Sequence, residues 1–173
     1  MNYMKNLILL ILLAILLVQC RFFDDKLSLP LMPYNGNQLR IDGYYYQIGY
    51  DGKTLFGTYF FYKNGILIPG EGIFDSFEKM DESVKRRFID KQSYKSDKLH
   101  WGVFLIEDNS ITFERWHSGT SADAYVREGV ILNDTTFHIT KIYRGNKSSP
   151  RNEKYYFRKF SPKPDSTNIF IKK

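Results

Sequence analysis

Three histidines, His100, His117 and His138, are the side chains of this sequence that could ligate a transition metal or act as a general base. No second histidine or cysteine stands at ligand spacing from any of them, and no His-Glu-x-x-His motif occurs. His117 directly precedes Ser118, but neighbours in a strand point to opposite faces, which separates a base from its nucleophile. We therefore interpret the histidines as residues of amphipathic strands, and we expect no metal and no cofactor.

Paired carboxylates could supply a general acid and a general base. Glu71 and Asp75 flank a glycine-rich bend, and Glu107, Asp108 and Asp123 fall in predicted turns. Acidic residues are common in turns because their side chains hydrogen-bond to the nearby backbone. The sequence also contains no Gly-x-Ser-x-Gly motif. These observations predict a protein that is not an enzyme.

The only cysteine, Cys20, follows an unbroken run of 12 apolar residues, 7–18, which is preceded by Lys5. A positive segment followed by a short apolar run is the layout of a secretory signal. A membrane-spanning helix needs about 20 apolar residues, so the run is too short to span a bilayer comfortably. We interpret residues 1–19 as a signal peptide, with an uncleaved anchor as the alternative.

Leu17-Val18-Gln19-Cys20 resembles the lipobox of bacterial lipoproteins, although Gln19 replaces the usual small residue. The resemblance implies that Cys20 becomes the first mature residue and carries acyl chains, which would include palmitate. Asp24-Asp25 is also similar to the acidic surface-export signals of Bacteroidota lipoproteins. The implied location is the bacterial cell envelope, lipid-anchored at the outer membrane and either periplasmic or surface-exposed. An ordinary signal peptide with an incidental cysteine is the alternative.

The basic residues are concentrated at the C-terminus, where Lys141–Lys173 contains ten Lys or Arg residues and two acids. Tyrosines and phenylalanines interleave with them, a combination that also suits nucleic acid. A secreted lipoprotein rarely meets nucleic acid, so we expect no nucleic-acid partner. An anionic envelope polymer is the partner that this basic C-terminal region favours, and a solvated strand face is the alternative.

Strands must position the histidines, acidic residues and basic residues described above. Aromatic and β-branched runs alternate with turn dipeptides throughout residues 40–160. An aromatic content of 17% argues against disorder, which requires little apolar mass. Asp51-Gly52, Asn64-Gly65, Asp108-Asn109 and Asn133-Asp134 are predicted to be tight hairpin turns, and 144–153 a long polar loop. The predicted strands are Arg40–Tyr50, Thr54–Tyr62, Ile66–Phe74, Leu99–Ile106, Ser110–His117, Ala124–Leu132, Thr135–Tyr143 and Lys154–Phe160.

One helix is predicted over Asp75–Lys91. Phe77, Met80, Val84 and Phe88 recur at helical spacing, and Asp75 is the expected N-cap, with Glu78 as its partner. The stripe is narrow, so the helix is expected to lie outside the sheet or over one end of a barrel. Residues 20–39 are interpreted as a lipidated tether, and 161–173 as a C-terminal tail.

Sequential hairpins favour an all-β fold, an eight-stranded antiparallel up-and-down barrel with one helix inserted after the third strand. An open β-sandwich is the alternative. Leu39–Tyr46 (LRIDGYYY) and Val130–Ile139 (VILNDTTFHI) are similar to the first strand and the recurrent strand–turn–strand pair of a lipocalin-like domain of bacterial lipoproteins. The resemblance covers about 39–160 and implies the barrel, although tyrosine replaces the usual first-strand tryptophan and the helix follows a different strand.

Two functions fit these observations. The first is a membrane-anchored, lipocalin-like lipoprotein that binds a small apolar or amphiphilic ligand in a tyrosine-rich lumen. The second is a non-enzymatic envelope interaction or structural lipoprotein whose barrel is filled by its own side chains. The sequence identifies no ligand-binding residues; the one residue with an assigned role is Cys20, as the lipidation site.

Overall fold

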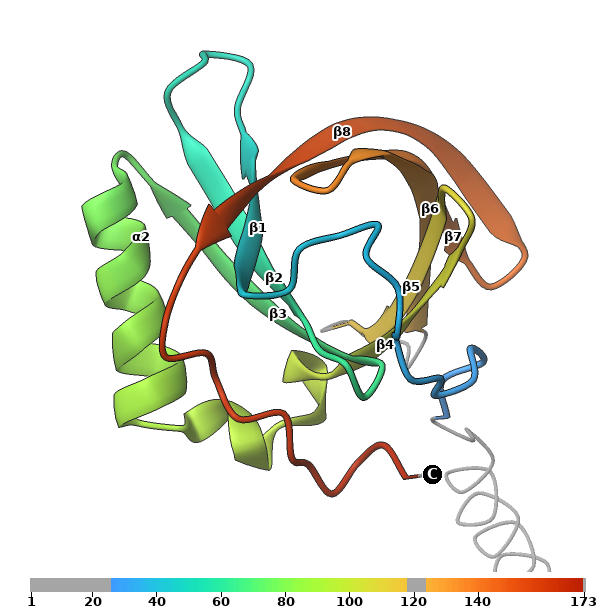
Figure 1. Cartoon of the computed structure of the whole chain (residues 1–173), viewed down its shortest axis with the longest axis horizontal. Helices are drawn as coiled ribbons and strands as arrows, with labels where there is room; N and C mark the ends of the chain where they lie inside the picture. Colours follow the sequence, from blue (N-terminus) through green and yellow to red (C-terminus); the bar gives the residue numbers. More distant parts are fainter. Residues whose placement is uncertain (1–25, 118–123, 173) are drawn as a thin grey trace, which may run out of the picture.

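The computed structural model describes residues 26–117 and 124–172, so the predicted signal peptide and Cys20 lie outside the described residues. Eight strands form one closed antiparallel barrel in chain order, and β8 pairs with β1 (Figure 1). The elements are β1 (Gly43–Ile48), β2 (Leu55–Phe61), β3 (Ile66–Phe74), α2 (Phe77–Val84), a π-helical turn (Lys85–Asp90), two 3₁₀ turns (Ser93–Ser96 and Lys98–His100), β4 (Gly102–Glu107), β5 (Ser110–Trp116), β6 (Ala124–Asn133), β7 (Thr136–Arg144) and β8 (Lys147–Lys159). The predicted barrel with one helix after the third strand is confirmed, and the closed sheet excludes the open β-sandwich.

Aromatic rings pack the inside of the barrel. Phe61 is almost completely buried, and its ring centroid lies 4.9 Å from that of Phe104 and 5.6 Å from that of Tyr45. Phe113 and Phe137 lie 6.1 and 5.8 Å from the same ring. These contacts are edge-to-face, a favoured geometry for aromatic pairs. We call the following inward rings the aromatic layer: Tyr45, Tyr59, Phe61, Phe113, Phe137 and Tyr155.

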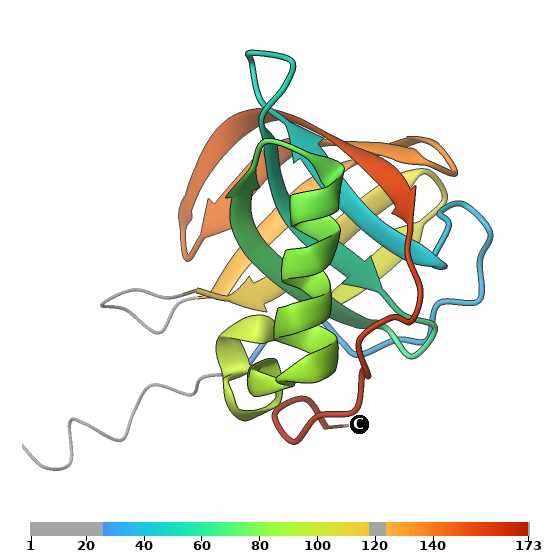
Figure 2. The same ribbon diagram turned by 90° about the vertical axis from the view of Figure 1, so that its left-hand side faces the viewer.

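The outer face of β1 to β3 is also apolar, and α2 covers it (Figure 2). Met80, Val84 and Phe88 are buried beneath the helix, as their spacing predicts. Asp81 then ties the helix to the barrel, because it accepts a 2.6 Å hydrogen bond from the Tyr44 hydroxyl and pairs with Arg158 at 2.6 Å. The strands β1 to β3 are apolar on both faces, and both faces are covered, one by the barrel interior and the other by α2.

The helix begins later than predicted. Its N-cap is Ser76, which has an extended backbone and accepts a hydrogen bond from the Lys79 amide. Asp75 instead pairs with the Lys79 ammonium at 2.6 Å. The expected Asp75 cap was wrong because Ser76 can fill the same role one residue later.

The predicted loop 144–153 was also wrong. A short turn at Gly145, whose φ is +53°, leads directly into the 13-residue strand β8. Pro150 in this strand suggested a loop, but it lies where β8 pairs with β7 alone, since β1 pairs only with Tyr155–Lys159. A proline is tolerated at such an edge because no ladder bond is lost on the free side.

The β1–β2 turn is longer than the two residues predicted. The strands end at Ile48 and resume at Leu55, and Gly49 donates its amide to the Thr54 carbonyl. The side chain of Asp51 accepts hydrogen bonds from the Lys53 and Thr54 amides and holds the loop. By contrast, Asp108-Asn109 is the expected two-residue connection between β4 and β5.

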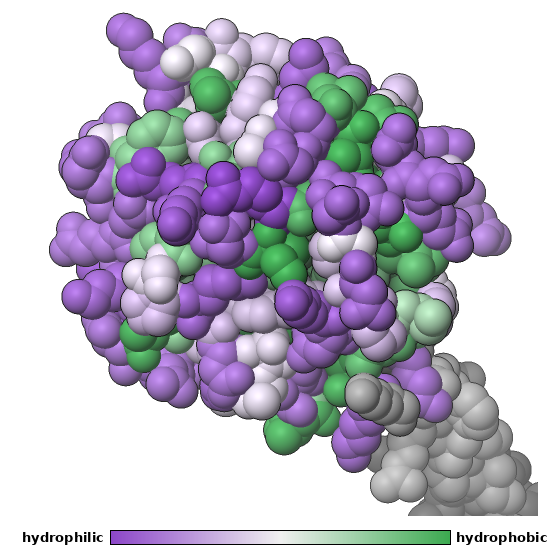
Figure 3. Space-filling view, in the orientation of Figure 1, coloured by the Kyte–Doolittle hydropathy of each residue, from purple (hydrophilic) through white to green (hydrophobic). Residues whose placement is uncertain are grey.

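One end of the barrel is closed by the segment that precedes β1, which crosses it (Figure 1). Tyr34 packs against Phe104 with ring centroids 5.6 Å apart, and the Leu39 amide donates to the Tyr34 hydroxyl at 2.8 Å. Ser28 and Leu29 bind the side chain of Glu114. Residues 26–39, expected as a tether, thus contain no helix or strand but pack on the barrel. Figure 3 shows this end as a largely hydrophilic surface with separate hydrophobic patches.

The C-terminal segment runs back along the barrel rather than hanging free. The Lys163 ammonium donates to the carbonyl oxygens of Ile41 and Phe61 at 2.6 and 2.7 Å, and it lies 3.9 Å from the centroid of the Tyr62 ring. The Tyr62 hydroxyl donates to the carbonyl of Pro164 at 2.6 Å. Among the described residues, no helix is long and apolar enough to cross a membrane.

Lys163 gives the stability of the protein a pH dependence that can be measured. Burial lowers the pKa of its ammonium to about 8, whereas an unfolded lysine titrates near pH 10.4. Between these values the unfolded chain binds more protons, so the native state gains stability as pH rises. We expect the free energy of unfolding of the native sequence, relative to Lys163→Met, to rise by about 1–2 kcal/mol from pH 7.5 to 9.5.

Urea titrations of both proteins at the two pH values measure this difference. The tyrosines are common to both proteins, so their titration cancels. A difference that stays level or falls with pH would show that the Lys163 ammonium titrates normally in the folded state.

Candidate ligand-binding site at the open end of the barrel

The end opposite the closing segment carries the β7–β8 hairpin, the end of β5 and the beginning of β6 (Figure 2). Tyr59 and Tyr155 of the aromatic layer lie 5.3 Å apart, and Tyr155 stacks on Phe137 at 4.9 Å. Toward the open end, cross-strand pairing places polar side chains on the same inner face, including those of Gln47 and Arg127. The lumen is therefore packed with aromatic rings in its closed half and lined by polar groups in its open half.

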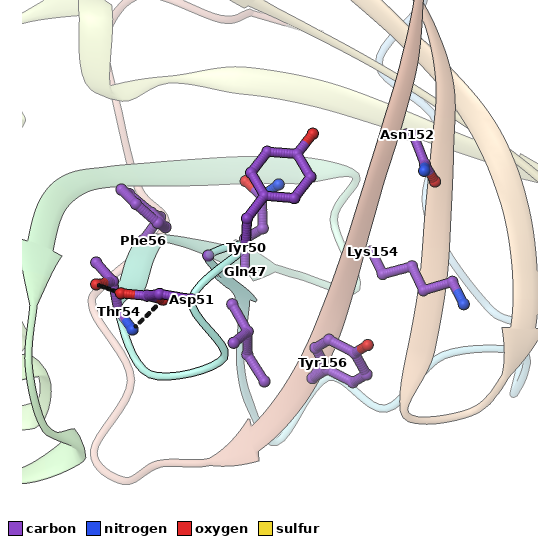
Figure 4. A pocket seen from close by; sticks show the side chains of 10 residues that line it. Gln47, Tyr50, Asp51, Thr54, Phe56, Asn152, Lys154 and Tyr156 are labelled. Atoms are coloured by element: carbon purple, nitrogen blue, oxygen red, sulfur yellow. Dashed lines mark hydrogen bonds between the residues drawn. The ribbon is translucent and has the colours of Figure 1, made fainter.

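A cavity of about 540 Å³ lies between the β1–β2 hairpin and β8. Figure 4 shows the hairpin side chains on one side and those of Asn152, Lys154 and Tyr156 on the other. The hairpin contributes Ile48 and Phe56 as apolar contacts. We call this space the hairpin cavity. Its volume and mixed lining fit a small amphiphilic molecule.

A second cavity of about 200 Å³ adjoins the hairpin cavity. The two share Gln47 and Phe56, and the inner one reaches Tyr59 and Tyr155 of the aromatic layer. A bulge at Gly57, whose φ is +50°, allows Phe56 and Tyr59 to face inward together. This conformation suits glycine because L side chains rarely adopt it.

A third cavity, of about 390 Å³, is lined by inward residues of β5 to β8, and we call it the cationic cleft. Strand register places Arg115, Tyr125, Arg144 and Lys147 opposite one another in one row across the four strands. The next row toward the aromatic layer is Phe113, Arg127, Ile142 and Ser149. Arg151 completes the positively charged lining.

Carboxylates beside the cleft offset part of this charge. Glu153 pairs with Arg127, accepts a hydrogen bond from the Tyr155 hydroxyl, and lies 3.6 Å from Arg151. Glu71 pairs with Arg115 at 3.1 Å across the gap between β3 and β5. Glu71 and Glu153 therefore pair with three of the five cations that line the cleft.

Burial shapes the protonation of the groups at this end. Burial opposes the charged form of Arg127, but Tyr59, Tyr155 and Glu153 raise its pKa above the ordinary value. Burial, followed by Arg115, lowers the pKa of His117, so its imidazole is neutral at pH 7. The arginines and Lys147 therefore hold the positive charge of the cleft.

Two buried nitrogen atoms at the cleft have no hydrogen-bond partner among the described residues. They are Nε of Arg115 and Nδ1 of His117. The His117 ring itself packs edge-on against Tyr125 with centroids 4.5 Å apart. An unsatisfied buried polar atom is costly, and a bound ligand or water is a usual explanation.

The structure separates the three histidines of the sequence. His117 lines the cationic cleft, His138 contacts the Asn152 side chain at 2.8 Å on the outer face, and His100 lies 3.7 Å from the carboxylate of Asp97. Within the described residues, no three His, Cys, Asp or Glu side chains gather as a metal site would require.

The basic C-terminal region is divided in the fold. Arg144, Lys147 and Arg151 line the cationic cleft, whereas Lys154 lines the hairpin cavity and Lys163 is half-buried against the barrel. Arg115 and Arg127 join the cleft from β5 and β6. The sequence did not identify Arg115 and Arg127 as site residues. An arginine in a strand can face the solvent or the barrel interior, and only the strand register shows which.

No protein-family model, curated protein or solved structure matches this chain in the comparisons made. The site must therefore be interpreted from its own geometry.

Proposed function

We propose that this protein is a lipocalin-like lipoprotein of the bacterial envelope that binds a small amphiphilic ligand at the open end of its barrel. The ligand would occupy the hairpin cavity and extend over the aromatic layer. The protein would act as a binding module and not as an enzyme. Acyl chains on Cys20 would hold it at the membrane, since two chains give stable anchoring.

The hairpin cavity and the inner cavity beside it carry this proposal. Aromatic rings at Phe56, Tyr59 and Tyr155 offer apolar area, and Gln47 and Lys154 offer polar contacts near it. A purely apolar ligand is less favoured, because the deep half of the lumen is already filled by the aromatic layer. An amphiphile fits the boundary between the rings and the polar rim.

Native mass spectrometry of the full chain, released from detergent in the instrument, tests the proposal. The probe is N-phenyl-1-naphthylamine, a neutral aromatic amphiphile, and we expect a one-to-one complex. In Lys154→Trp the indole would fill the hairpin cavity, and the bound fraction should fall by about five-fold or more. In the same preparation, the N-terminal peptide should begin at Cys20 and carry acyl chains.

Lys141→Trp is the matched control, because it makes the same replacement on the outer face of β7 outside the hairpin cavity. It should bind the probe like the native chain. Equal binding by all three proteins, or by none, would count against the hairpin cavity as the site. The filled-barrel interaction protein would then be the better interpretation.

A further inference from the structure

The first described residues of the chain are attached to the outer wall of the barrel. The Leu29 amide donates to one carboxylate oxygen of Glu114 at 2.7 Å, and the Ser28 hydroxyl donates to the other at 3.1 Å. Glu114 is only 3% exposed, so this attachment is enclosed. Leu27 and Leu31 pack against the apolar cluster outside the barrel. The barrel therefore fixes the place from which the preceding part of the chain must start.

The C-terminal segment lies beside this N-terminal segment (Figures 1 and 2). Apolar residues of both segments line one cavity of about 190 Å³, among them Leu29, Leu31, Phe170 and Ile171. Both segments also contact the β2–β3 turn. The Asn64 side chain donates to the Ser166 hydroxyl at 3.1 Å, and the Tyr34 amide donates to the Lys63 carbonyl at 2.8 Å. We call this side of the molecule the terminal surface, which consists of residues 26–34, 63–65 and 166–172.

Two apolar side chains of the terminal surface point into the solvent. Ile169 is 74% exposed and Met32 is 50% exposed. The Asn168 side chain accepts hydrogen bonds from the Phe170 and Ile171 amides at 3.0 and 2.7 Å. This turn presents Ile169 outward while the two residues after it pack against the barrel. Apolar side chains held in this way are suited to burial at the boundary between lipid headgroups and acyl chains.

The charges of the terminal surface favour an anionic bilayer. Its residues include Lys26, Lys63 and Lys172 and no acidic residue. Lys63 and Lys172 are exposed. The nearest acid in the C-terminal segment, Asp165, is paired with Lys95. Anionic headgroups attract basic side chains that lie close to a membrane surface.

The proposed acyl anchor lies only a short way along the chain from this surface. Residues 21–25 separate Cys20 from Lys26, and a fully extended chain of this length spans at most about 20 Å. Acyl chains on Cys20 would therefore keep the terminal surface within that distance of the bilayer. We infer that the terminal surface docks on an anionic bilayer, with Ile169 and Met32 in the interface. This inference deepens the proposed function and rests on it, because it requires the lipidated cysteine.

Docking in this way would place the ligand-binding site on the far side of the barrel. In both Figure 1 and Figure 2 the β1–β2 hairpin, which lines the hairpin cavity, projects at the top, whereas the C-terminal segment lies at the bottom. The hairpin cavity would then open toward the aqueous compartment. The ligand would enter from that compartment and not from the bilayer that supports the protein.

Quenching of a fluorescent label by lipid tests the docking in the full, lipidated chain. Ile169→Cys supplies one free thiol, because acylation blocks Cys20, and the thiol is labelled with a nitrobenzoxadiazole dye. The protein is reconstituted into vesicles of phosphatidylcholine and phosphatidylglycerol, with doxyl-labelled phosphatidylcholine as the quencher. We expect the label at Ile169 to be quenched about three-fold more strongly than a label on the far side of the barrel, because it lies in the interface.

Ile73→Cys is the matched control on the far side. Ile73 is also an isoleucine and is 72% exposed. It lies near the end of β3 away from the β2–β3 turn, about 23 Å along the strand from Ile66. Met32→Cys tests a second position of the terminal surface, and its label should be quenched like that at Ile169. A melting temperature close to that of the native chain shows that each labelled variant is folded.

The mass of the N-terminal peptide separates failure of this inference from failure of the proposed function. If Cys20 is acylated but the labels at Ile169 and Met32 are quenched no more than that at Ile73, the inference is wrong and the lipoprotein stands. Protection of the Ile169 label from aqueous iodide without quenching by lipid would show that a protein covers the surface, which also overturns the inference. If Cys20 carries no acyl chain, the proposed anchor is wrong and the inference fails with it.

Discussion

Phe61→Ala should destabilise the protein by about 3–5 kcal/mol, because it removes a fully buried ring from the centre of the barrel. The ring makes edge-to-face contacts with Tyr45, Phe104, Phe113 and Phe137. Those neighbours come from β1, β4, β5 and β7, so the cavity left behind cannot be closed by moving one strand. The melting temperature should fall by roughly 8–15 °C in a domain of this size.

Differential scanning calorimetry measures the change, and Tyr50→Ala is the control. Tyr50 is also a large aromatic residue, but its side chain is fully exposed at the β1–β2 turn. Its removal should change stability by no more than about 0.5 kcal/mol. Similar losses in the two variants would mean that the rings inside the barrel are not packed as described.

Glu153→Ala should cost about 2–4 kcal/mol, because it leaves the Arg127 guanidinium enclosed without a counter-charge. Both side chains are mostly buried, at 16% and 20% exposed, and Glu153 also accepts the hydrogen bond from the Tyr155 hydroxyl. Burial, followed by Tyr59, raises the pKa of Tyr155, so its hydroxyl stays neutral and remains a donor. The substitution therefore removes the acceptor for two donors at once.

A double variant distinguishes the net contribution of the charge pair from the cost of leaving one of its partners unpaired. In Arg127→Met with Glu153→Leu, no enclosed charge is left unpaired, because Arg151, the other partner of Glu153, is 44% exposed, and most of the lost stability should return. Asp42→Ala, which breaks the exposed pair with Arg40, should cost less than about 1 kcal/mol. Urea midpoints compare the variants. If the double variant is as unstable as Glu153→Ala, the charge pair is not the source of the loss.

The order and number of strands could be predicted from the sequence because each hairpin is a local feature. Aromatic and β-branched runs end at turn residues, and Gly52, Gly65 and Gly145 take positive φ values where the chain reverses. The helix could also be predicted from the sequence, because the spacing of Met80, Val84 and Phe88 is a local pattern that does not depend on distant residues. Loop lengths were less predictable, because Pro150 suits either a loop or a strand edge.

The candidate site could not be predicted, because it depends on register across strands far apart in sequence. The basic C-terminal region indicated an anionic partner, but only the pairing of β5 to β8 brings Arg115 and Arg127 beside Arg144 and Lys147. A shift of one residue would turn all four to the opposite face. The sequence likewise left open whether the tyrosines line a lumen or fill it.

The sequence by itself determined the all-β class, the eight strands, the helix after the third of them and the position of the only cysteine. The alternation of apolar runs with turn residues, the turn residues themselves and the helical spacing of apolar side chains are all local properties. They can therefore be recognised in the sequence without knowledge of the tertiary structure. The tertiary structure decided that the closed half of the barrel is filled with rings and that the open half carries cavities and enclosed arginines. Both features follow from closure of the sheet into a barrel, because closure brings together side chains that are far apart in the sequence.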